Sequence, residues 1–230
     1  LQQPQGPTAH KYRALVPHIQ NAYELFQVFD EARRTRGAME FDTVETRIVT
    51  NAVGKIERIE PAVRNDAPRL IEEFMLAANT CAADYMTRSK RQGLYRVHDG
   101  PTPEKLKLLR DFLRNLGLSL GGDESPSTHD YAKLLDEARA RPDFEIIQMM
   151  CLRSLQQAIY SPEQDGHFGL AYERYAHFTS PIRRYPDLLT HRVVKSILQR
   201  KRYTPQLAEL GDTSDLSAQE RELAVWEQLG

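Results

Sequence analysis

The feature that most constrains this chain is the run Tyr175–Arg192, YAHFTSPIRRYPDLLTHR, in which an extended pattern gives way to a helical one. Its aromatic first part is typical of a strand. A serine followed by proline, as at Ser180 and Pro181, favours a helix start, because the serine oxygen can accept from free backbone N–H groups. Since a second proline, Pro186, is costly deep inside a helix, we expect the helix to begin between Pro181 and Asp187. The run therefore predicts a strand-to-helix junction.

Two adjacent arginines, Arg183 and Arg184, fall at this junction. Backbone N–H groups at a helix start attract anions, and a guanidinium can bind a phosphate through two parallel hydrogen bonds. The pair is therefore a candidate phosphate site. The alternative is that both are surface residues beside a capped helix, where charged side chains are common. The spacing alone does not decide between the two.

The sequence HFTSPIRRYPDLLTHR resembles the signature of the ribonuclease II/ribonuclease R (RNB) family of 3′→5′ exoribonucleases, and within it bacterial ribonuclease R most. Two further stretches support the resemblance, Leu70–Asn79 (LIEEFMLAAN) and His167–Leu170 (HFGL). It extends over nearly the whole chain. It implies that Arg183 acts on the scissile or leaving phosphate, where a fixed cation stabilises developing charge.

The resemblance implies RNA-binding roles for further residues near the arginines. Ser180 and Arg184 shape or flank the phosphate site. Tyr175 and His177, on the aromatic run before it, are also RNA-binding candidates, although a lone histidine is more often a core or wall residue than a ligand.

Two more candidates come from the first third of the chain. By its place in RGAMEF, the resemblance implies that Phe41 stacks on a base near the RNA 3′ end, and stacking suits every base. The alternative is a core aromatic. The resemblance also makes Glu72 a catalytic candidate near the terminal nucleotide. Neighbours on a helix point about 100° apart, so Glu72 and Glu73 cannot form one acid–base pair, and we expect one to face solvent and the other the core edge. Both could instead complement the helix N-terminus.

Composition bounds the class of protein. The 230 residues are 40% hydrophobic and 27% charged, which suits a soluble protein with a sizeable core. No apolar run approaches the roughly 18 residues of a membrane span, so we expect no membrane partner. The net charge is −1, but residues 171–205 carry eight basic and two acidic residues, a local +6 against −7 elsewhere. A basic region in a neutral chain fits one phosphate-facing wall. Cys81 and Cys151 read as buried, reduced thiols of a cytoplasmic protein.

Hydrophobic periodicity predicts an α+β chain that is mostly helical with short antiparallel strands. A hairpin is indicated by Gly54 between two strand-like segments. The dyad His98–Asp99 is unfavoured as a catalytic pair because strand neighbours face opposite sides. We expect helices over 12–36, 67–89, 103–116, 131–139, 142–159 and 217–229, and strands over 38–41, 46–52, 55–60, 94–98 and 172–178.

The chemistry implied by the resemblance is hydrolysis of single-stranded or structured RNA to nucleoside 5′-monophosphates by a processive, Mg²⁺-dependent enzyme acting from a single-stranded 3′ end. Such a reaction needs clustered carboxylates. Neither Asp123–Glu124 nor Glu72–Glu73 resembles a tight cage, so we expect no metal ligands here. We expect residues 1–230 to be one partial RNB catalytic domain. The resemblance implies that the Asp-rich half lies upstream, that a Glu-bearing helix follows downstream, and that cold-shock or S1-type RNA-binding domains flank the catalytic domain.

Three functional hypotheses follow. The first is that the chain belongs to a monomeric exoribonuclease and is inactive or very weak alone. The second is a degenerate RNB-like module that binds RNA or protein without catalysis. The third, a purely structural helical domain, leaves the arginine motif unexplained.

Overall fold

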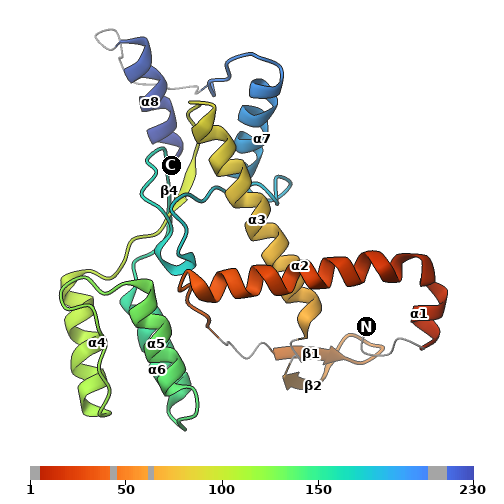
Figure 1. Cartoon of the computed structure of the whole chain (residues 1–230), viewed down its shortest axis with the longest axis vertical. Coiled ribbons are helices and arrows are strands. Elements are labelled where there is room, and N and C mark those ends of the chain that lie inside the picture. The colour runs from red at the N-terminus through yellow and green to blue at the C-terminus, as the bar shows by residue number, and fades with distance from the viewer. Residues whose placement is uncertain (1–5, 42–45, 62–64, 207–216) are drawn as a thin grey trace. The chain divides into compact units, whose positions relative to one another are not determined.

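The computed structural model describes residues 6–41, 46–61, 65–206 and 217–230. The chain divides into two compact units (Figure 1). The first unit combines Leu1–Arg33 with Glu40–Phe74, and the second combines Arg34–Met39 with Met75–Gly230. Helices dominate and the strands are short and antiparallel, so the predicted α+β class is confirmed. None of the helices in the described residues combines the length and apolar character that a bilayer crossing requires.

The first unit begins with the short helices α1 (Pro7–Lys11) and η1 (Arg13–Leu15), followed by the long α2 (Val16–Thr35). The helix predicted over 12–36 is therefore confirmed in its main part. It ends before Gly37, whose φ of +73° suits glycine. Phe26 is buried, and Phe29 packs edge-on against Phe74 at a ring-centroid distance of 5.9 Å.

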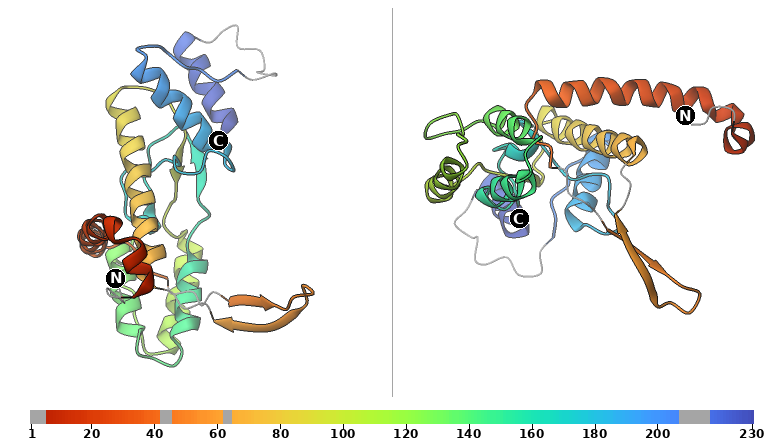
Figure 2. Two further views of the ribbon diagram at one scale, coloured as in Figure 1. Left: turned by 90° about the vertical axis from the view of Figure 1, so that its right-hand side faces the viewer. Right: turned by 90° about the horizontal axis from the view of Figure 1, so that it is seen from below.

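The predicted hairpin is confirmed as β1 (Thr46–Thr50) paired antiparallel with β2 (Ile56–Pro61) (Figure 2). Its turn is fixed by Asn51, whose Oδ1 accepts from the backbone N–H groups of Val53 and Lys55, both at 3.0 Å. Gly54 supplies the positive φ of +78° that the turn requires.

Helix α3 (Asp66–Arg88) begins in the first unit and ends in the second. At its start the Asn65 side chain accepts from a free backbone N–H group, that of Ala67, at 3.0 Å. The apolar Ile71 is 56% exposed on this helix. The buried positions are Glu73, Leu76, Asn79, Ala82, Ala83 and Met86.

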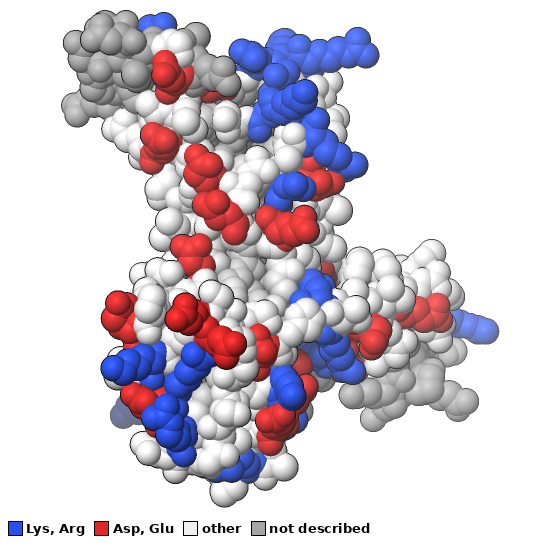
Figure 3. Space-filling model, turned by 60° about the vertical axis from the view of Figure 1, so that its left-hand side comes forward, with Lys and Arg blue, Asp and Glu red and all other residues white. Residues whose placement is uncertain are grey.

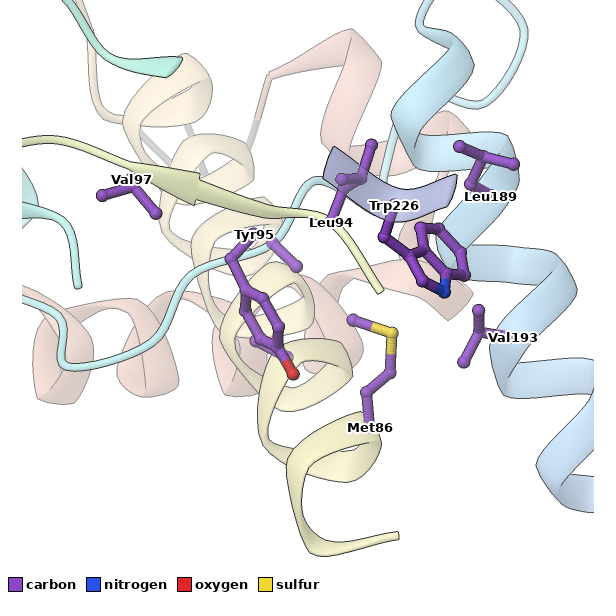
Figure 4. Packing of buried hydrophobic residues seen from close by; sticks show 9 residues of the cluster. Met86, Leu94, Tyr95, Val97, Leu189, Val193 and Trp226 are labelled. Carbon is purple, nitrogen blue, oxygen red and sulfur yellow. The ribbon is translucent and has the colours of Figure 1, made fainter. Parts of the chain in front are cut away.

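The core of the second unit gathers around a two-stranded sheet of β3 (Tyr95–Val97) and β4 (Ile159–Ser161). Side chains from α3, from α7 (Tyr185–Leu198) and from α8 (Ala218–Leu229) pack against β3 (Figure 4). Trp226 of α8 is wholly buried there beside Met86 and Leu189. This core joins the helix that follows the arginine pair to α3.

Three further helices, α4 (Pro103–Asn115), α5 (Thr128–Ala138) and α6 (Phe144–Ser154), form a second core in the same unit. Helix α6 packs against both of the others. The sequence marks their ends: Gly117 has φ +70° after α4, and Ser127 and Asp130 form a capping box at α5. Cys151 is buried here, and burial raises its pKa to about 12. Cys81, expected to be buried, is exposed, and both thiols are free.

Several predicted elements are wrong or too long. The segment 38–41 has no ladder partner among the described residues, so it is not a strand. The helix predicted over 142–159 ends at Ser154, and Ile159 belongs to β4. The strand predicted over 172–178 is irregular, and its one ladder-like bond to β3 runs from Arg96 N to Tyr175 O at 2.7 Å. The segment is irregular because the Asn79 side chain, not a neighbouring strand, accepts from its backbone N–H groups.

Candidate functional site

Residues 175–179, which lead to the arginine pair, are held by one buried side chain, Asn79 of α3. Its Oδ1 accepts from the backbone N–H groups of Phe178 at 2.8 Å and Thr179 at 3.2 Å. Its Nδ2 donates to the Tyr175 hydroxyl at 2.9 Å. Asn79 is only 2% exposed. A carboxamide therefore replaces a neighbouring strand as the partner of this segment.

The arginine pair lies on a turn, not at the predicted serine-capped helix start. We call Ser180–Asp187 the arginine corner. The carbonyl of Ser180 accepts from the N–H groups of Arg183 at 3.2 Å and Arg184 at 3.1 Å. Helix α7 begins only at Tyr185, and Pro186 is its second residue, where proline loses no hydrogen bond. The helix start thus falls inside the expected range but is not capped by the Ser180 side chain.

Asp187, in the first turn of α7, closes the corner from inside. Its Oδ1 accepts from Ser180 N at 2.7 Å and from Arg184 Nη2 at 2.8 Å. Arg184 Nε lies 2.7 Å from Oδ2, and the carboxylate is wholly buried. Arg184 therefore holds the turn through a buried ion pair, and its role beside a phosphate stays a prediction.

Arg183 differs from its neighbour because it is exposed. Its guanidinium forms no hydrogen bond or ion pair with any part of the chain that the structure describes. The side chain before it, Ile182, is also fully exposed. The turn therefore presents one unpaired cation on a backbone that Ser180 and Asp187 fix. An unpaired guanidinium on a fixed backbone is suited to binding an anionic oxygen.

The aromatic run contributes two residues with different surroundings. Tyr175 is 6% exposed, and its ring meets those of His167 and His177 edge-on. Its hydroxyl is held by Asn79, and contact between this ring and RNA stays a prediction. His177 is half-buried, and its Nδ1 lies 2.7 Å from the Tyr160 hydroxyl. Burial and then the nearby charge of Arg184 lower the pKa of His177 to about 4, so the ring is neutral near pH 7.

A histidine pair behind this segment is structural. His98 Nδ1 accepts from Gly169 N at 3.0 Å, and Nε2 lies 3.0 Å from Gln156 O. Burial lowers the pKa of His98 and brings that of His167, whose ring centroid is 4.8 Å away, to about 3. The unfavoured His98–Asp99 dyad is therefore not formed, since both His98 nitrogens have other partners.

Glu72 and Glu73 lie in the first unit, and one is exposed while the other is buried, as predicted. Glu73 is 4% exposed and accepts from Arg33 Nη1 at 2.7 Å. Glu72 keeps 45% of its side chain exposed, with Oε1 3.8 Å from the same nitrogen. Burial by itself would lower the pKa of Arg33. The hydrogen bond and charge of Glu73 and the charge of Glu72 have the larger combined effect, so the pKa of Arg33 is raised. Phe41, in the same unit, is half-buried, and its stacking role stays a prediction.

The carboxylates of the described residues do not fit a divalent cation. No three or more His, Cys, Asp or Glu side chains lie together in 6–41, 46–61, 65–206 or 217–230 in a way that could hold one. Asp187 is committed to Arg184 and Ser180, and Glu73 to Arg33. Asp123 and Glu124 are exposed on a loop.

Sequence reasoning missed Asn79 and Asp187 as the residues that position the corner. A usable signal existed for Asn79: it is a polar residue inside LIEEFMLAAN, three before the apolar Ala82. Asp187 offered none, because an acidic residue in a first helical turn is ordinarily explained by the helix dipole.

Comparison with known proteins gives a consistent result. The chain matches the RNB domain model over residues 2–200. It is 52% identical to ribonuclease R of Vibrio cholerae over 201 residues, which is 85% of this chain and 24% of that protein. The chain thus spans about a quarter of the length of this curated relative.

Solved structures of RNase R also resemble this chain in fold. The apo form of Mycoplasma genitalium RNase R matches with a TM-score of 0.78 at 27% identity, over 94% of this chain and 32% of that one. The same protein in complex with ribose methylated single-stranded RNA matches with a TM-score of 0.77 at 28% identity, over 94% and 32%.

Proposed function

Because the chain belongs to the RNB-domain family, we propose that it forms part of the catalytic domain of a processive, Mg²⁺-dependent 3′→5′ exoribonuclease. The enzyme hydrolyses single-stranded or structured RNA to nucleoside 5′-monophosphates from a single-stranded 3′ end. Similarity to ribonuclease R of Vibrio cholerae, and to Mycoplasma genitalium RNase R in complex with ribose methylated single-stranded RNA, supports this proposal.

The observation that carries the proposal is the contrast between Arg183 and Arg184. Arg184 is consumed by the buried carboxylate of Asp187, which makes the turn rigid, whereas Arg183 is exposed and unpaired in the described structure. A cation held by a preorganised backbone costs no reorganisation when charge develops on a phosphate oxygen. We assign Arg183 to the scissile or leaving phosphate, with Ser180 shaping the turn beneath it.

We assign two positioning roles to the first unit. Phe41, which is half-buried, stacks on a base near the 3′ end, and stacking preserves activity on every sequence. Glu72, the more exposed of the two glutamates, orients the terminal nucleotide, while Glu73 and Arg33 support its helix from the buried side. A glutamate oxygen suits this task because it can accept from ribose hydroxyls.

We propose that the carboxylates that hold Mg²⁺ lie mostly in parts of the enzyme outside this chain; the described acidic side chains form no group that could hold the ion. Those carboxylates would hold Mg²⁺, whose chemistry at the phosphate would be charge stabilisation and activation of a water. We further propose a monomer in the cytoplasm. Two free cysteines, one of them exposed, favour a reducing compartment.

The test is an RNA degradation assay with a 5′-labelled oligonucleotide and Mg²⁺, run on the complete enzyme and on the 230-residue chain. We expect the complete enzyme to shorten RNA from the 3′ end and release nucleoside 5′-monophosphates. We expect the chain alone to release them very slowly or not at all. Robust release by the chain alone would refute the assignment of the metal site. A complete enzyme that binds RNA but never shortens it would establish the non-catalytic binding module instead.

A further inference from the structure

A polar cavity of about 460 Å³ lies in the second unit, at the end where helices α3 and α7 finish. Figure 3 shows Lys and Arg side chains gathered at the upper end of the face in view, which is that end. The cavity has no aliphatic or aromatic lining residue among those described, and it is lined by Thr87, Lys90, Arg91, Gln92, Gln164, Arg202 and Glu222. A ligand here is therefore recognised through polar or charged groups.

Three cations converge on this cavity without acidic partners. Lys90, Arg91 and Arg202 form no ion pair within the described residues, although Glu222 also lines the cavity. Arg91 in addition has a buried Nε with no hydrogen-bond acceptor. A buried guanidinium N–H without a partner is unfavourable, and an anionic oxygen in the cavity would remove that penalty.

The backbone that brings two of these cations to the cavity is strained. Lys90 has φ +52°, its N–H bonds to Thr87 O, and Arg91 N bonds to Met86 O. This is the helix C-cap in which glycine usually occupies the left-handed position. A lysine there disfavours the fold relative to glycine, but it places a cation at the cavity. The helix dipole explains basic residues near helix ends, but not three of them lining one cavity.

The geometry points to a phosphate-binding site at this cavity, separate from the arginine corner and independent of the proposed function. Net lining charge is positive, since three cations face one carboxylate. The carbonyl end of α3 repels anions, so binding depends on the side chains and not on backbone N–H groups. An arginine guanidinium can donate two parallel hydrogen bonds to phosphate oxygens, and a lysine ammonium adds a further positive charge. The phosphate belongs either to the RNA backbone or to a free phosphate monoester.

The test is calorimetric titration of the 230-residue chain with inorganic phosphate in low-salt buffer. We expect saturable binding at one site with a dissociation constant on the order of 1 mM. Lys90→Gln and Arg202→Gln should each weaken it about fivefold by removing a charge-assisted contact. Glu222→Gln should strengthen it, because the one opposing charge is lost. Lys107→Gln, at an exposed lysine of α4, is the matched control and should bind like the unaltered chain.

Lys90→Gly separates a ligand site from a merely structural cluster. Glycine relieves the positive φ, so this variant should melt at the same temperature or higher while its phosphate affinity falls as in Lys90→Gln. The proposal is overturned if the unaltered chain shows no saturable phosphate binding. It is equally overturned if Lys90→Gln, Lys90→Gly and Arg202→Gln bind phosphate as Lys107→Gln does.

Two further titrations identify the source of the phosphate. If Lys90→Gln and Arg202→Gln weaken binding of a single-stranded RNA and make it less salt-dependent, the site holds an RNA backbone phosphate. If RNA binding is unchanged while a nucleoside 5′-monophosphate binds more weakly to the variants, the site holds a free monoester. Either result supports a phosphate site, and activity of the complete enzyme is not needed to read it.

Discussion

Asp187 and Arg184 are joined by two contacts across a single helical turn, Nη2 to Oδ1 at 2.8 Å and Nε to Oδ2 at 2.7 Å. The carboxylate is wholly buried and the arginine side chain is 21% exposed. The same carboxylate holds Ser180 N, so one ion pair fixes both ends of the turn that carries Arg183. The neighbour of the proposed catalytic cation thus has a structural task, and adjacent arginines of one motif do different work.

Asp187→Asn should destabilise the chain by about 3 kcal/mol, because it leaves the largely buried guanidinium of Arg184 without its counter-charge. Urea unfolding measures the change. Asp111→Asn removes a carboxylate that pairs with the exposed Arg114, and it should cost well under 1 kcal/mol. Equal effects of the two substitutions would show that the buried pair does not stabilise the corner.

Asn79→Ala should cost about 3 kcal/mol, because the buried N–H groups of Phe178 and Thr179 lose their acceptor. Tyr175→Phe removes only one hydroxyl and should cost about 1 kcal/mol. Thr80→Ala is the matched control on the same helix, since Thr80 bonds only to carbonyls of its own helix. If Asn79→Ala unfolds in urea like Thr80→Ala, the carboxamide does not hold the segment.

Stability should fall as pH falls from about 6.5 towards about 4, in part through His177. The folded-state pKa of His177 lies below its unfolded value, so the unfolded chain binds a proton that the folded chain does not. That contribution is complete above the unfolded pKa and is lost through this window. His177→Gln should reduce the slope of the unfolding free energy against pH. The reduction corresponds to at most one proton fewer taken up on unfolding. An unchanged slope would mean that His177 titrates normally in the folded chain.

Phe41→Ala should weaken binding of single-stranded RNA to the complete enzyme about tenfold, because one base loses its stacking partner. Phe41→Tyr keeps an aromatic face and should bind nearly as well. Fluorescence anisotropy with a 5′-labelled oligonucleotide, in buffer without divalent cations, measures both affinities. If alanine and tyrosine at this position bind RNA equally, Phe41 is a packing residue.

Local patterns were enough to predict much of the fold. Helix α2 ends where Gly37 follows three basic residues, the hairpin turns at Gly54, and Ser217 caps α8 as its sequence indicates. Each signal lies within a few residues of the feature that it predicts. Propensity, capping and turn chemistry act over that range.

Features set by distant partners could not be predicted in this way. The run 172–178 has the composition of a strand, yet Asn79, about a hundred residues away, takes the N–H groups that a strand partner would take. Likewise the serine-capped helix start was wrong, because Asp187 binds Ser180 N from within the helix. The burial of Tyr175 likewise depends on distant parts of the chain, since its ring meets that of His167 and its hydroxyl meets Asn79.

The central claim is that Arg183, presented unpaired by a turn that Arg184 and Asp187 hold rigid, acts on the phosphate during RNA cleavage. The most direct test is the single-turnover cleavage rate of a 3′-terminal nucleotide by the complete enzyme with Arg183→Gln, beside its RNA affinity. We predict a rate at least about a hundredfold lower with much less change in affinity, as for loss of one preorganised charge donor. A cleavage rate equal to that of the unaltered enzyme would contradict the account.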